Sequence, residues 1–352
     1  MNRLQSKLEK IGRDPIITAK AVSLRYCVNY SKGYFRIKNK NTYHYIDQNK
    51  NSINDPEILT RISKLVLPPA WENVWISPYE NGHLQATGID SKGRKQYRYH
   101  NQWNKIRNQS KFYRIQSFAV ALPLIRKQVE QDLKNKNLTY EKVIALVIKL
   151  IEITNIRIGN ETYKKLYGSF GLTTLQDRHV GFQNSKIRFE FTGKKGVKHK
   201  INLISKKLAT LVQKCKDIPG QDLFQYYDLQ GKHHTIGSAD VNNYLKSITN
   251  QDFTAKDFRV WSGSVNALSA FQQLKPPVNQ IESKRKIIEV IDEVALKLGN
   301  TRSVCKKYYV HPTVIAAFEK GSIWQYKSKK INVKFLPEEY ALLKLLDKEI
   351  IA

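Results

Sequence analysis

The sequence predicts an α+β fold in two parts, a small β-rich domain over residues 1–106 and a larger, mainly helical domain over residues 107–352. Short segments in which apolar and polar residues alternate fill the first hundred positions, and apolar residues at helical spacing replace them from about Phe112. The length of 352 residues suits about two domains. Hydrophobic residues make up 41% of the chain, enough to form a sizeable core.

The β-rich part is predicted from two stretches that alternate apolar with polar residues. The first is "LRYCVNYSKGYFRIKNKNTYHYID", residues 24–47. The second is "WENVWISPYENGHLQATGIDSKGRKQYRYH", residues 71–100, with turn signals at Asn81-Gly82 and Lys92-Gly93. We therefore expect several short strands in this part.

Helices dominate the predictions for the second part. Apolar residues recur at helical spacing from Ile115 to Leu122, and residues 140–153 are apolar on nearly every side, which predicts a buried helix. Further helices are expected over residues 238–247, 264–274 and 282–298, the last followed by a capping Gly299. Between them, "SKIRFEFTG" and "VKHKINLI" flank "KKG" and predict a strand pair.

The charge of the chain indicates a polyanionic partner. Sixty Lys and Arg residues against 30 Asp and Glu give a net charge of +30 and a pI near 9.9. The longest apolar stretch, "VIALVIKLIEI", is too short for a membrane span and contains Lys149 and Glu152. The first residues lack the apolar centre of a signal peptide, and the three widely spaced cysteines suggest neither a disulfide framework nor a thiolate zinc site. We expect an intracellular, non-secreted protein that binds nucleic acid.

Several familiar chemistries lack their residues. "GKKG" has Arg188 where a phosphate-binding P-loop requires glycine, no HExxH motif occurs, and His233-His234 have no third ligand at helical spacing. No carboxylate pair suggests two-metal chemistry. We therefore expect no metal and no nucleotide cofactor. Fixed cations could stabilise a pentavalent phosphate instead, and tyrosine could be a covalent nucleophile.

Three cationic residues are candidates for such a site, although each has an ordinary alternative. Arg157 in "NIRIGNETY" follows the buried helix, where an arginine usually complements the helix dipole. Lys194 tops the predicted hairpin, where lysines are usually exposed charges. Arg259 in "KDFRVWSG" lies among apolar neighbours and so needs an anionic partner or ligand.

The segment "GNTRSVCKKYYVHP" supplies a polar residue and two tyrosines. Asn300 follows the glycine, where asparagine is ordinarily a turn former. Tyr308 and Tyr309 are adjacent, and adjacent side chains on a helix point roughly 100° apart, so at most one of them faces a given site.

Taken together and in this order, these segments resemble the type IB DNA topoisomerases, most closely the poxvirus-like and bacterial branch. "LPPAWENVWISPYENGHLQATGIDSKGRKQYRYH" is similar to that branch's N-terminal domain, and "RIGNETY", "FTGKKGVKH", "KDFR" and "GNTRSVCKKYYVHP" are similar to its catalytic segments. The resemblance runs from about Leu67 to about Phe318. It implies a catalytic domain of the tyrosine recombinase and type IB topoisomerase kind, with a β-hairpin that carries the lysine.

The resemblance also implies a reaction and a role for each candidate. The enzyme would nick one strand of duplex DNA through a 3′-phosphotyrosine intermediate, let supercoils relax by swivelling and religate the strand, without ATP or metal. Tyr309, nine positions after Asn300, would be the nucleophile. Arg157 and Arg259 would clamp the non-bridging phosphate oxygens, and Lys194 would be the general acid for the leaving 5′ oxygen. Asn300 stands where poxviral enzymes have histidine, and would donate a hydrogen bond to the phosphate.

DNA contacts are implied on both parts of the chain. One face of a strand could present aromatic side chains and an amide to the groove edges while cations neighbour phosphates; the alternative is a solvated strand with cross-strand aromatic pairs. The contact residues expected from the family pattern are Gln96, Tyr97, Tyr99, Arg94, Lys95, Arg98, Asn160 and Tyr163. We expect a monomer that closes as a clamp around DNA, in the cytoplasm (nucleoid) of a bacterium or encoded by a virus.

Two other functions are compatible with parts of this pattern. A tyrosine recombinase shares the covalent chemistry, but usually has histidine three residues before the second arginine, where this chain has Lys256. Recombinases also have a helical rather than a β-rich N-terminal module. A non-catalytic basic DNA-binding protein would explain the charge, but it would have no use for the catalytic constellation.

Overall fold

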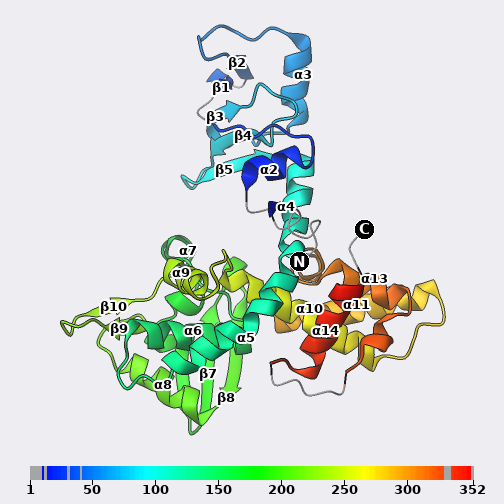
Figure 1. Ribbon diagram of the computed structural model, residues 1–352. Helices are drawn as coiled ribbons and strands as arrows, with labels where there is room; N and C mark the ends of the chain where they lie inside the picture. The colour runs from blue at the N-terminus through cyan, green and yellow to red at the C-terminus, as the bar shows by residue number, and fades with distance from the viewer. Residues whose placement is uncertain (1–9, 12–13, 30–31, 40–41, 329–333, 350–352) are drawn as a thin grey trace. The chain divides into compact units, whose positions relative to one another are not determined.

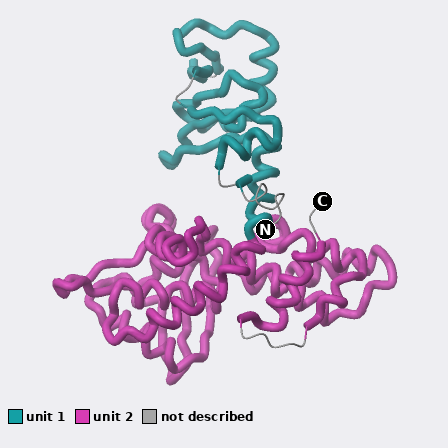
Figure 2. Tube along the Cα trace, in the orientation of Figure 1, with its two compact units in different colours: residues 1–114 teal, residues 115–352 magenta. Residues whose placement is uncertain are grey.

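The computed structural model describes residues 10–11, 14–29, 32–39, 42–328 and 334–349 (Figure 1). The chain forms two compact units, Met1–Arg114 and Ile115–Ala352 (Figure 2). The expected boundary between residues 106 and 107 falls within a helix of the first unit, α4 (Asn101–Tyr113).

The first unit is built on a five-stranded antiparallel sheet in the order β2-β1-β3-β4-β5. The strands are β1 (Tyr34–Asn39), β2 (Thr42–Ile46), β3 (Glu72–Ile76), β4 (Leu84–Ile89) and β5 (Lys95–Tyr99). The predicted β-rich character is thus confirmed. Because β5 is an edge strand, one side of its backbone is not paired within the sheet.

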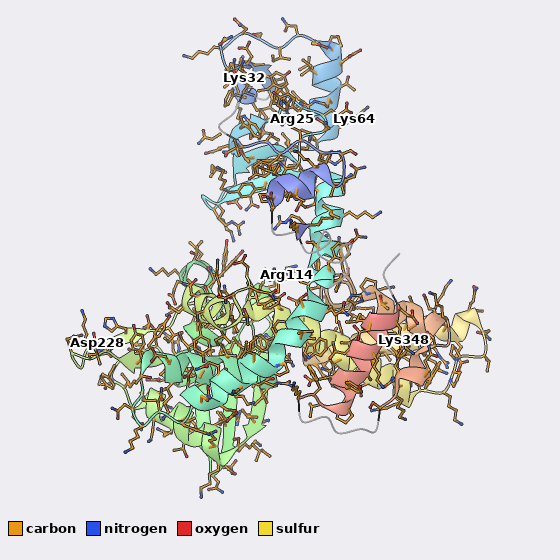
Figure 3. All side chains as sticks on the ribbon, viewed as in Figure 1. Arg25, Lys32, Lys64, Arg114, Asp228 and Lys348 are labelled. Carbon is orange, nitrogen blue, oxygen red and sulfur yellow. The ribbon has the colours of Figure 1, made fainter. Side chains whose placement is uncertain are left out.

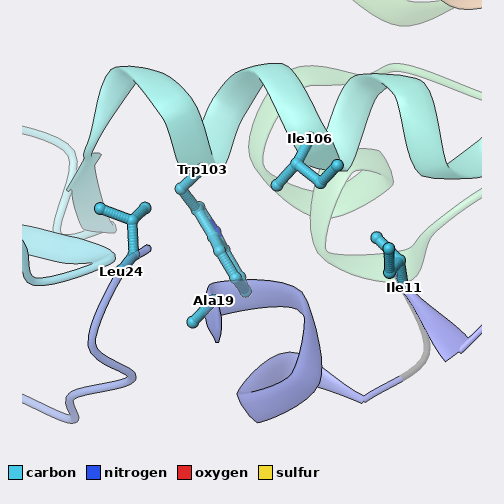
Figure 4. Close-up of a cluster of buried hydrophobic side chains, with 5 residues drawn as sticks. All are labelled: Ile11, Ala19, Leu24, Trp103 and Ile106. Carbon is cyan, nitrogen blue, oxygen red and sulfur yellow. The ribbon is translucent and has the colours of Figure 1, made fainter. Parts of the chain in front are cut away.

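Helices α2 (Pro15–Lys20), α3 (Pro56–Lys64) and α4 accompany this sheet. Strand-like alternation does not predict them, but an Asp-Pro pair starts both α2 and α3, with Asp14 and Asp55 as N-caps. Helix α4 buries Trp103 and Ile106 against Ile11, Ala19 and Leu24 (Figure 4). This cluster anchors α2 and its flanking residues to α4.

The second unit is built around α6 (Tyr140–Thr154), which packs against four other helices: α5 (Ile115–Asp132), α8 (Lys206–Lys216), α9 (Ser238–Thr249) and α10 (Ala255–Gln273). Eight apolar side chains of α6 are at most 1% exposed: Val143, Ile144, Ala145, Leu146, Val147, Ile148, Leu150 and Ile151. The predicted buried helix is therefore confirmed, and it packs against α10, the helix that carries Arg259.

Helices α9, α10 and α11 (Gln280–Lys297) correspond to the helices predicted over residues 238–247, 264–274 and 282–298. Helices α7 (Glu161–Tyr167), α8, α12 (Arg302–Tyr308), α13 (Pro312–Glu319) and α14 (Pro337–Lys348) were not predicted. Helix α10 begins nine residues before the predicted start at Ser264, because Thr254 and Asp257 form a capping box there. Gly299 follows α11 with φ +58°, as a C-terminal capping glycine does.

Two small antiparallel sheets complete the second unit. The predicted strand pair is β7 (Lys186–Thr192) and β8 (Lys198–Ile204), to which β6 (Val180–Gln183) adds a third strand that alternation did not predict. The other sheet pairs β9 (Gln225–Tyr227) with β10 (His233–Thr235). The predicted fold class, a small β-rich part followed by a larger, mainly helical one, is confirmed.

Charged side chains extend outward from both units, among them Lys32 and Lys64 of the first and Lys348 of the second (Figure 3). None of the helices formed by the described residues combines the length and apolar composition needed to cross a bilayer.

Candidate active site

Arg157 lies in the loop that follows α6. Asn155 ends the helix in the left-handed conformation, at φ 56°. A second segment holds the loop in place, because Leu172 N donates to the Arg157 carbonyl oxygen at 2.7 Å and Thr173 N to that of Ile158 at 2.6 Å. The guanidinium Nη2 of Arg157 donates to the Gly299 carbonyl oxygen at 3.0 Å and to Oδ1 of Asn300. The fold thus brings Arg157 and Asn300 together, 143 positions apart in the chain.

Arg259 lies on the first half of α10 and is only 3% exposed. Its Nη1 donates to the Asn155 carbonyl oxygen, and its Nη2 to that of Leu298 at 2.8 Å. Its Nε is buried without a hydrogen-bond partner among the described residues. Burial lowers the pKa of Arg259, and Tyr309 opposes this effect. The described partners of Arg157 and Arg259 are carbonyl and amide oxygens rather than carboxylates, so two positive charges are available to an anionic ligand.

Tyr309 follows the last residue of α12, and its backbone rests on α10. A Cβ on Gly263 would lie 2.7 Å from the Tyr309 carbonyl oxygen, so glycine is needed there for space. Oγ of Ser264 lies 3.3 Å from the same oxygen and accepts from His311 N at 3.0 Å. These contacts set the position of Tyr309 relative to Arg259, which lies about one turn before Gly263 and Ser264 on α10.

The two adjacent tyrosines face different groups. The Tyr309 ring centroid lies 4.9 Å from Cζ of Arg259, whereas the Tyr308 ring lies 5.5 Å from Nζ of Lys307. Tyr309 is therefore the tyrosine that meets the arginine cluster.

The surroundings of Tyr309 favour its ionised form. Burial alone would raise the pKa of the phenol, but the charge of Arg259, with smaller contributions from Arg157 and Lys256, lowers it below the ordinary 10.0. Lys256 is exposed on the first turn of α10. In the sequence it stood out only as a departure from the recombinase pattern, yet its position three residues before Arg259, on one face of a helix, could have indicated it.

Lys194 lies exposed at the tip of the β7–β8 hairpin, where Lys195 takes a positive φ of 64° to close the turn. Its Nζ is 5.7 Å from the ring centroid of Tyr163 on α7. Oδ1 of Asn160 caps the same helix by accepting from Tyr163 N at 3.0 Å. The described contacts of Lys194 thus join it to Tyr163 and not to Arg157, Arg259 or Tyr309.

The expected DNA contacts of the first unit are divided between the two faces of β5. Tyr97 and Tyr99 lie on one face, with ring centroids 5.8 Å apart and planes 8° from parallel. Nζ of Lys95 lies 5.8 Å from the Tyr97 ring centroid, on the same face. Successive residues of a strand point to opposite faces, so Gln96 and Arg98 lie on the other face. The expectation that one face presents both the aromatic side chains and the amide is therefore wrong.

Asp90 holds two of the expected contact residues on the second face. Its Oδ2 accepts from Arg94 Nε at 2.6 Å and from Gln96 Nε2 at 2.8 Å. The Arg94 side chain is the main cause of the low pKa of Asp90. Arg98 and Tyr97 remain exposed.

No group of three or more His, Cys, Asp or Glu side chains within the described ranges is arranged to hold a metal ion. His233 and His234, which the sequence does not favour as metal ligands, have local partners: Nδ1 of His233 lies 2.8 Å from Gln225 Oε1, and Nε2 of His234 lies 2.7 Å from Asp228 Oδ2.

Comparison with known proteins identifies the family. A model of the catalytic core of eukaryotic DNA topoisomerase I matches residues 100–335, which include all five catalytic candidates. A DNA topoisomerase 1B of Acanthamoeba polyphaga mimivirus is 31% identical over 288 residues, which is 79% of this chain and 85% of the relative. The chain belongs to the type IB DNA topoisomerase family. Its substrate is therefore DNA, and its activity is that of an ATP-independent isomerase.

Other similarities support this assignment. The N-terminal domain model of bacterial DNA topoisomerase IB matches residues 42–90 of this topoisomerase. The DNA topoisomerase 1B of Vaccinia virus (strain Copenhagen) is 24% identical over 263 residues, covering 72% of this chain and 78% of the relative. The DNA topoisomerase 1 of Rabbit fibroma virus is 25% identical over 252 residues, covering 69% and 75%. The recombinase and the non-catalytic DNA-binding protein are both disfavoured by these matches.

Proposed function

We propose that this topoisomerase relaxes supercoiled DNA by a transient single-strand break in which Tyr309 is the nucleophile. The phenol oxygen attacks a backbone phosphorus, the bond to the 5′ oxygen breaks, and a 3′-phosphotyrosine forms. The observation that carries the proposal is the contact between the Tyr309 ring and Arg259, beside the Arg157–Asn300 pair and without a carboxylate partner. The lowered pKa of Tyr309 fits this role, because a phenolate is a better nucleophile than a phenol.

Arg157, Arg259 and Asn300 stabilise the pentavalent phosphate. Negative charge on the non-bridging oxygens increases as the transition state forms, and fixed donors at those oxygens therefore lower the barrier. Asn300 can donate through its amide, but unlike histidine it carries no positive charge. Its Oδ1 already accepts from Arg157 and its Nδ2 donates to the Leu298 carbonyl oxygen at 3.4 Å, which leaves the second Nδ2 hydrogen for the phosphate.

Lys194 supplies the proton that the leaving 5′ oxygen requires. A lysine on an exposed hairpin tip can reach a phosphate bound above the arginines once DNA is present. Religation is the reverse: the 5′ hydroxyl attacks the phosphotyrosine, its proton returns to the lysine, and Tyr309 leaves. The phosphotyrosine conserves the energy of the broken bond, which is why no ATP is consumed, and none of these steps needs a metal ion.

The first unit contributes DNA contacts through β5. Tyr97, Tyr99 and Lys95 form one contact face, in which a cation and two aromatic side chains can meet the grooves and phosphates. Together the units act as a monomeric clamp around duplex DNA. The enzyme is virus-encoded or bacterial, in keeping with its viral relatives and its match to a bacterial N-terminal domain.

A plasmid relaxation assay with EDTA and without ATP tests the proposal. The wild-type enzyme is expected to relax both positive and negative supercoils. Tyr309→Phe removes the nucleophile and is expected to lower relaxation by at least about 1,000-fold while DNA binding persists. Tyr308→Phe is the matched control and is expected to stay within about threefold of wild type. Normal relaxation by Tyr309→Phe, or its loss only in Tyr308→Phe, would show that the nucleophile is misassigned.

A further inference from the structure

His199 lies on β8 between two loops that carry proposed catalytic residues. It pairs with Phe191 across β7 and β8, and the two rings are stacked with centroids 4.9 Å apart and planes 18° from parallel. The sequence alone indicates no role for this histidine, and none of the proposed catalytic steps uses it.

The first loop meets His199 at Gly193, the residue before Lys194. A Cβ on Gly193 would lie 2.7 Å from both Cδ2 and Nε2 of the His199 ring. Gly193 has φ −93°, which any residue can adopt, so the glycine is needed here because the imidazole occupies the space of a side chain. The backbone that leads to Lys194 therefore lies directly against this ring.

The second loop meets the same ring at Gly299, the residue before Asn300. A Cβ on Gly299 would lie 2.4 Å from Cε1 and 3.2 Å from Nδ1 of His199. The carbonyl oxygen of Gly299 also accepts the hydrogen bond from Arg157. Thus one imidazole fills the space beside two glycines that are 106 residues apart, each next to a proposed catalytic residue.

The ring is suited to this place because it can remain uncharged. Burial lowers the pKa of His199, and the positive charges of Arg157 and Arg259 lower it further. A neutral imidazole adds no repulsion beside the two guanidinium groups, as a lysine or arginine would. Neither ring nitrogen has a hydrogen-bond partner in the part of the chain that the structure describes, so packing alone fixes the ring.

We propose that His199 is a positioning residue for DNA cleavage, which packs the Lys194 loop against the Asn300 loop so that the general acid and the phosphate-binding groups act on the same phosphate. The inference rests on the proposed function of Lys194. Its consequence is that His199 affects the reaction chiefly through protonation of the leaving oxygen, because the hairpin tip that carries Lys194 is otherwise largely exposed.

Single-turnover cleavage of two matched DNA substrates tests this inference. One substrate has the ordinary 5′ oxygen at the cleavage site, and the other has a 5′ sulfur, a better leaving group that needs no proton. His199→Ala is expected to cleave the oxygen substrate about 30-fold more slowly than wild type, since small displacements of a catalytic group cost up to about 100-fold. On the sulfur substrate it is expected to be within about threefold of wild type. Equal slowing on both substrates would overturn the inference.

Three further variants make the result specific. His234→Ala is the matched control, because His234 also lies on a strand and stacks on an aromatic ring, Tyr226, but contacts neither loop; it should cleave both substrates normally. Lys194→Ala should show the same rescue by sulfur, and adding His199→Ala to it should slow cleavage no further. If Lys194→Ala is not rescued, the proposed general acid is wrong; if it is rescued and His199→Ala is not, only the role of His199 fails.

Gly193→Ala tests the same contact by changing the glycine instead of the histidine. It remains a valid test even if His199→Ala does not fold. The added methyl group collides with the imidazole, so the variant is expected to lose cleavage of the oxygen substrate and to recover it with sulfur. Gly181→Ala is its control, since a Cβ on Gly181 in β6 would meet nothing within 4 Å. Normal cleavage of the oxygen substrate by Gly193→Ala would contradict the inference.

Discussion

At the scale of single residues, the site depends on two arginines whose charges are not neutralised by the partners that the described residues supply. Arg157 and Arg259 are both held by carbonyl oxygens, which orient a guanidinium without cancelling its charge. The result is a phenol, Tyr309, with a pKa below that of free tyrosine despite its burial. The same charges are available to stabilise a phosphate in its transition state.

Arg259→Lys tests whether the geometry of the guanidinium matters as well as its charge. A lysine ammonium cannot donate from one planar fork to the carbonyl oxygens of Asn155 and Leu298 and also face Tyr309 and the phosphate. We expect single-turnover cleavage to slow by about 100-fold or more, with DNA binding little changed. Arg188→Lys is the control, because Arg188 lies exposed on β7 and pairs with Glu190. Equal rates for Arg259→Lys and wild type would mean that charge alone suffices.

At the scale of secondary-structure elements, α10 joins Arg259, the proposed phosphate-binding arginine, to Tyr309, the proposed nucleophile. The helix carries Arg259 and, one turn later, Gly263 and Ser264, which contact the Tyr309 backbone. The distance between the two proposed catalytic side chains is therefore set by a rigid helix rather than by a loop alone, as precise catalysis requires.

Gly263→Ala should disturb this arrangement without removing any catalytic group. The new Cβ would lie 2.7 Å from the Tyr309 carbonyl oxygen, a backbone atom that cannot move without moving the nucleophile. We expect cleavage and religation to slow together, by roughly 10- to 100-fold, on oxygen and sulfur substrates alike. Gel-based cleavage and religation assays measure both steps, with Gly181→Ala as the control. If Gly263→Ala cleaved and religated DNA at wild-type rates, the position of the Tyr309 backbone on α10 would not be critical for the reaction.

A second element, α14, is fixed by a buried ionic network. Glu339 accepts from Arg126 Nη2 at 2.7 Å and from Trp261 Nε1 at 3.0 Å, and Arg126 also pairs with Glu152. Burial alone would raise the pKa of Glu339, but these donors outweigh it and hold the pKa below the ordinary 4.5. The network thus ties α14 to α5, to α6, which precedes the Arg157 loop, and to α10, which carries Arg259.

The sign of the pH dependence follows from this lowered pKa. An acid whose pKa is lower in the folded protein stabilises the fold above its unfolded-state pKa, and the stabilisation is lost as pH falls through the folded-state value. Glu339→Gln is therefore expected to lower the free energy of unfolding by about 2 kcal/mol at pH 7. This loss is smaller than that expected when a buried charge loses its sole partner, because Arg126 still pairs with Glu152. The deficit should shrink below about pH 4.

Urea denaturation at pH 7 and at low pH measures this difference. Asp292→Asn is the control, because Asp292 and Arg302 form a pair whose side chains are 46% and 53% exposed. Such solvent-exposed pairs contribute little to stability, so this variant should unfold almost like wild type. A deficit for Glu339→Gln that is the same at both pH values would mean that the carboxylate charge is not what holds α14.

At the scale of the whole molecule, the net charge of +30 predicts that DNA binding is largely electrostatic and therefore depends on salt. Each cation that contacts a phosphate releases counterions from the DNA. The logarithm of the binding constant therefore falls linearly with the logarithm of the salt concentration. With several phosphate contacts, we expect noncovalent binding to fall by at least about 100-fold between roughly 50 and 200 mM salt. Tyr309→Phe should show the same slope of log affinity against log salt concentration as wild type, because the neutral phenol is not one of the cations that contact phosphates. An affinity that does not change with salt would contradict an electrostatic interface.

The sequence predicts the local features of this molecule better than its long-range contacts. Helix α6, the β7–β8 hairpin and the spacing from Asn300 to Tyr309 follow from periodicity and motif, because each is encoded in neighbouring residues. The start of α10 and the third strand β6 were missed, since a capping box and an edge strand leave weak signals. The contact of His199 with Gly193 and Gly299 joins distant segments, and only the folded chain reveals it.

The faces of β5 show a second limit. The cluster of candidate DNA contacts around Gln96 was visible in the sequence, but strict alternation along the strand separates Gln96 from the tyrosines on either side of it. Asp90 also accepts hydrogen bonds from the side chains of Arg94 and Gln96. These bonds depend on the turn that Gly93 closes at φ 71°.

The most direct test is to trap the covalent intermediate and identify the atom that holds the DNA. Wild-type enzyme is mixed with a labelled duplex, denatured during turnover and digested, and the DNA-bearing peptide is sequenced by mass spectrometry. We predict a phosphate diester between the Tyr309 phenol oxygen and the 3′ end of the nicked strand, with a free hydroxyl on the 5′ end. An adduct on Tyr308 or on any other side chain, or a link to the 5′ end, would contradict the account.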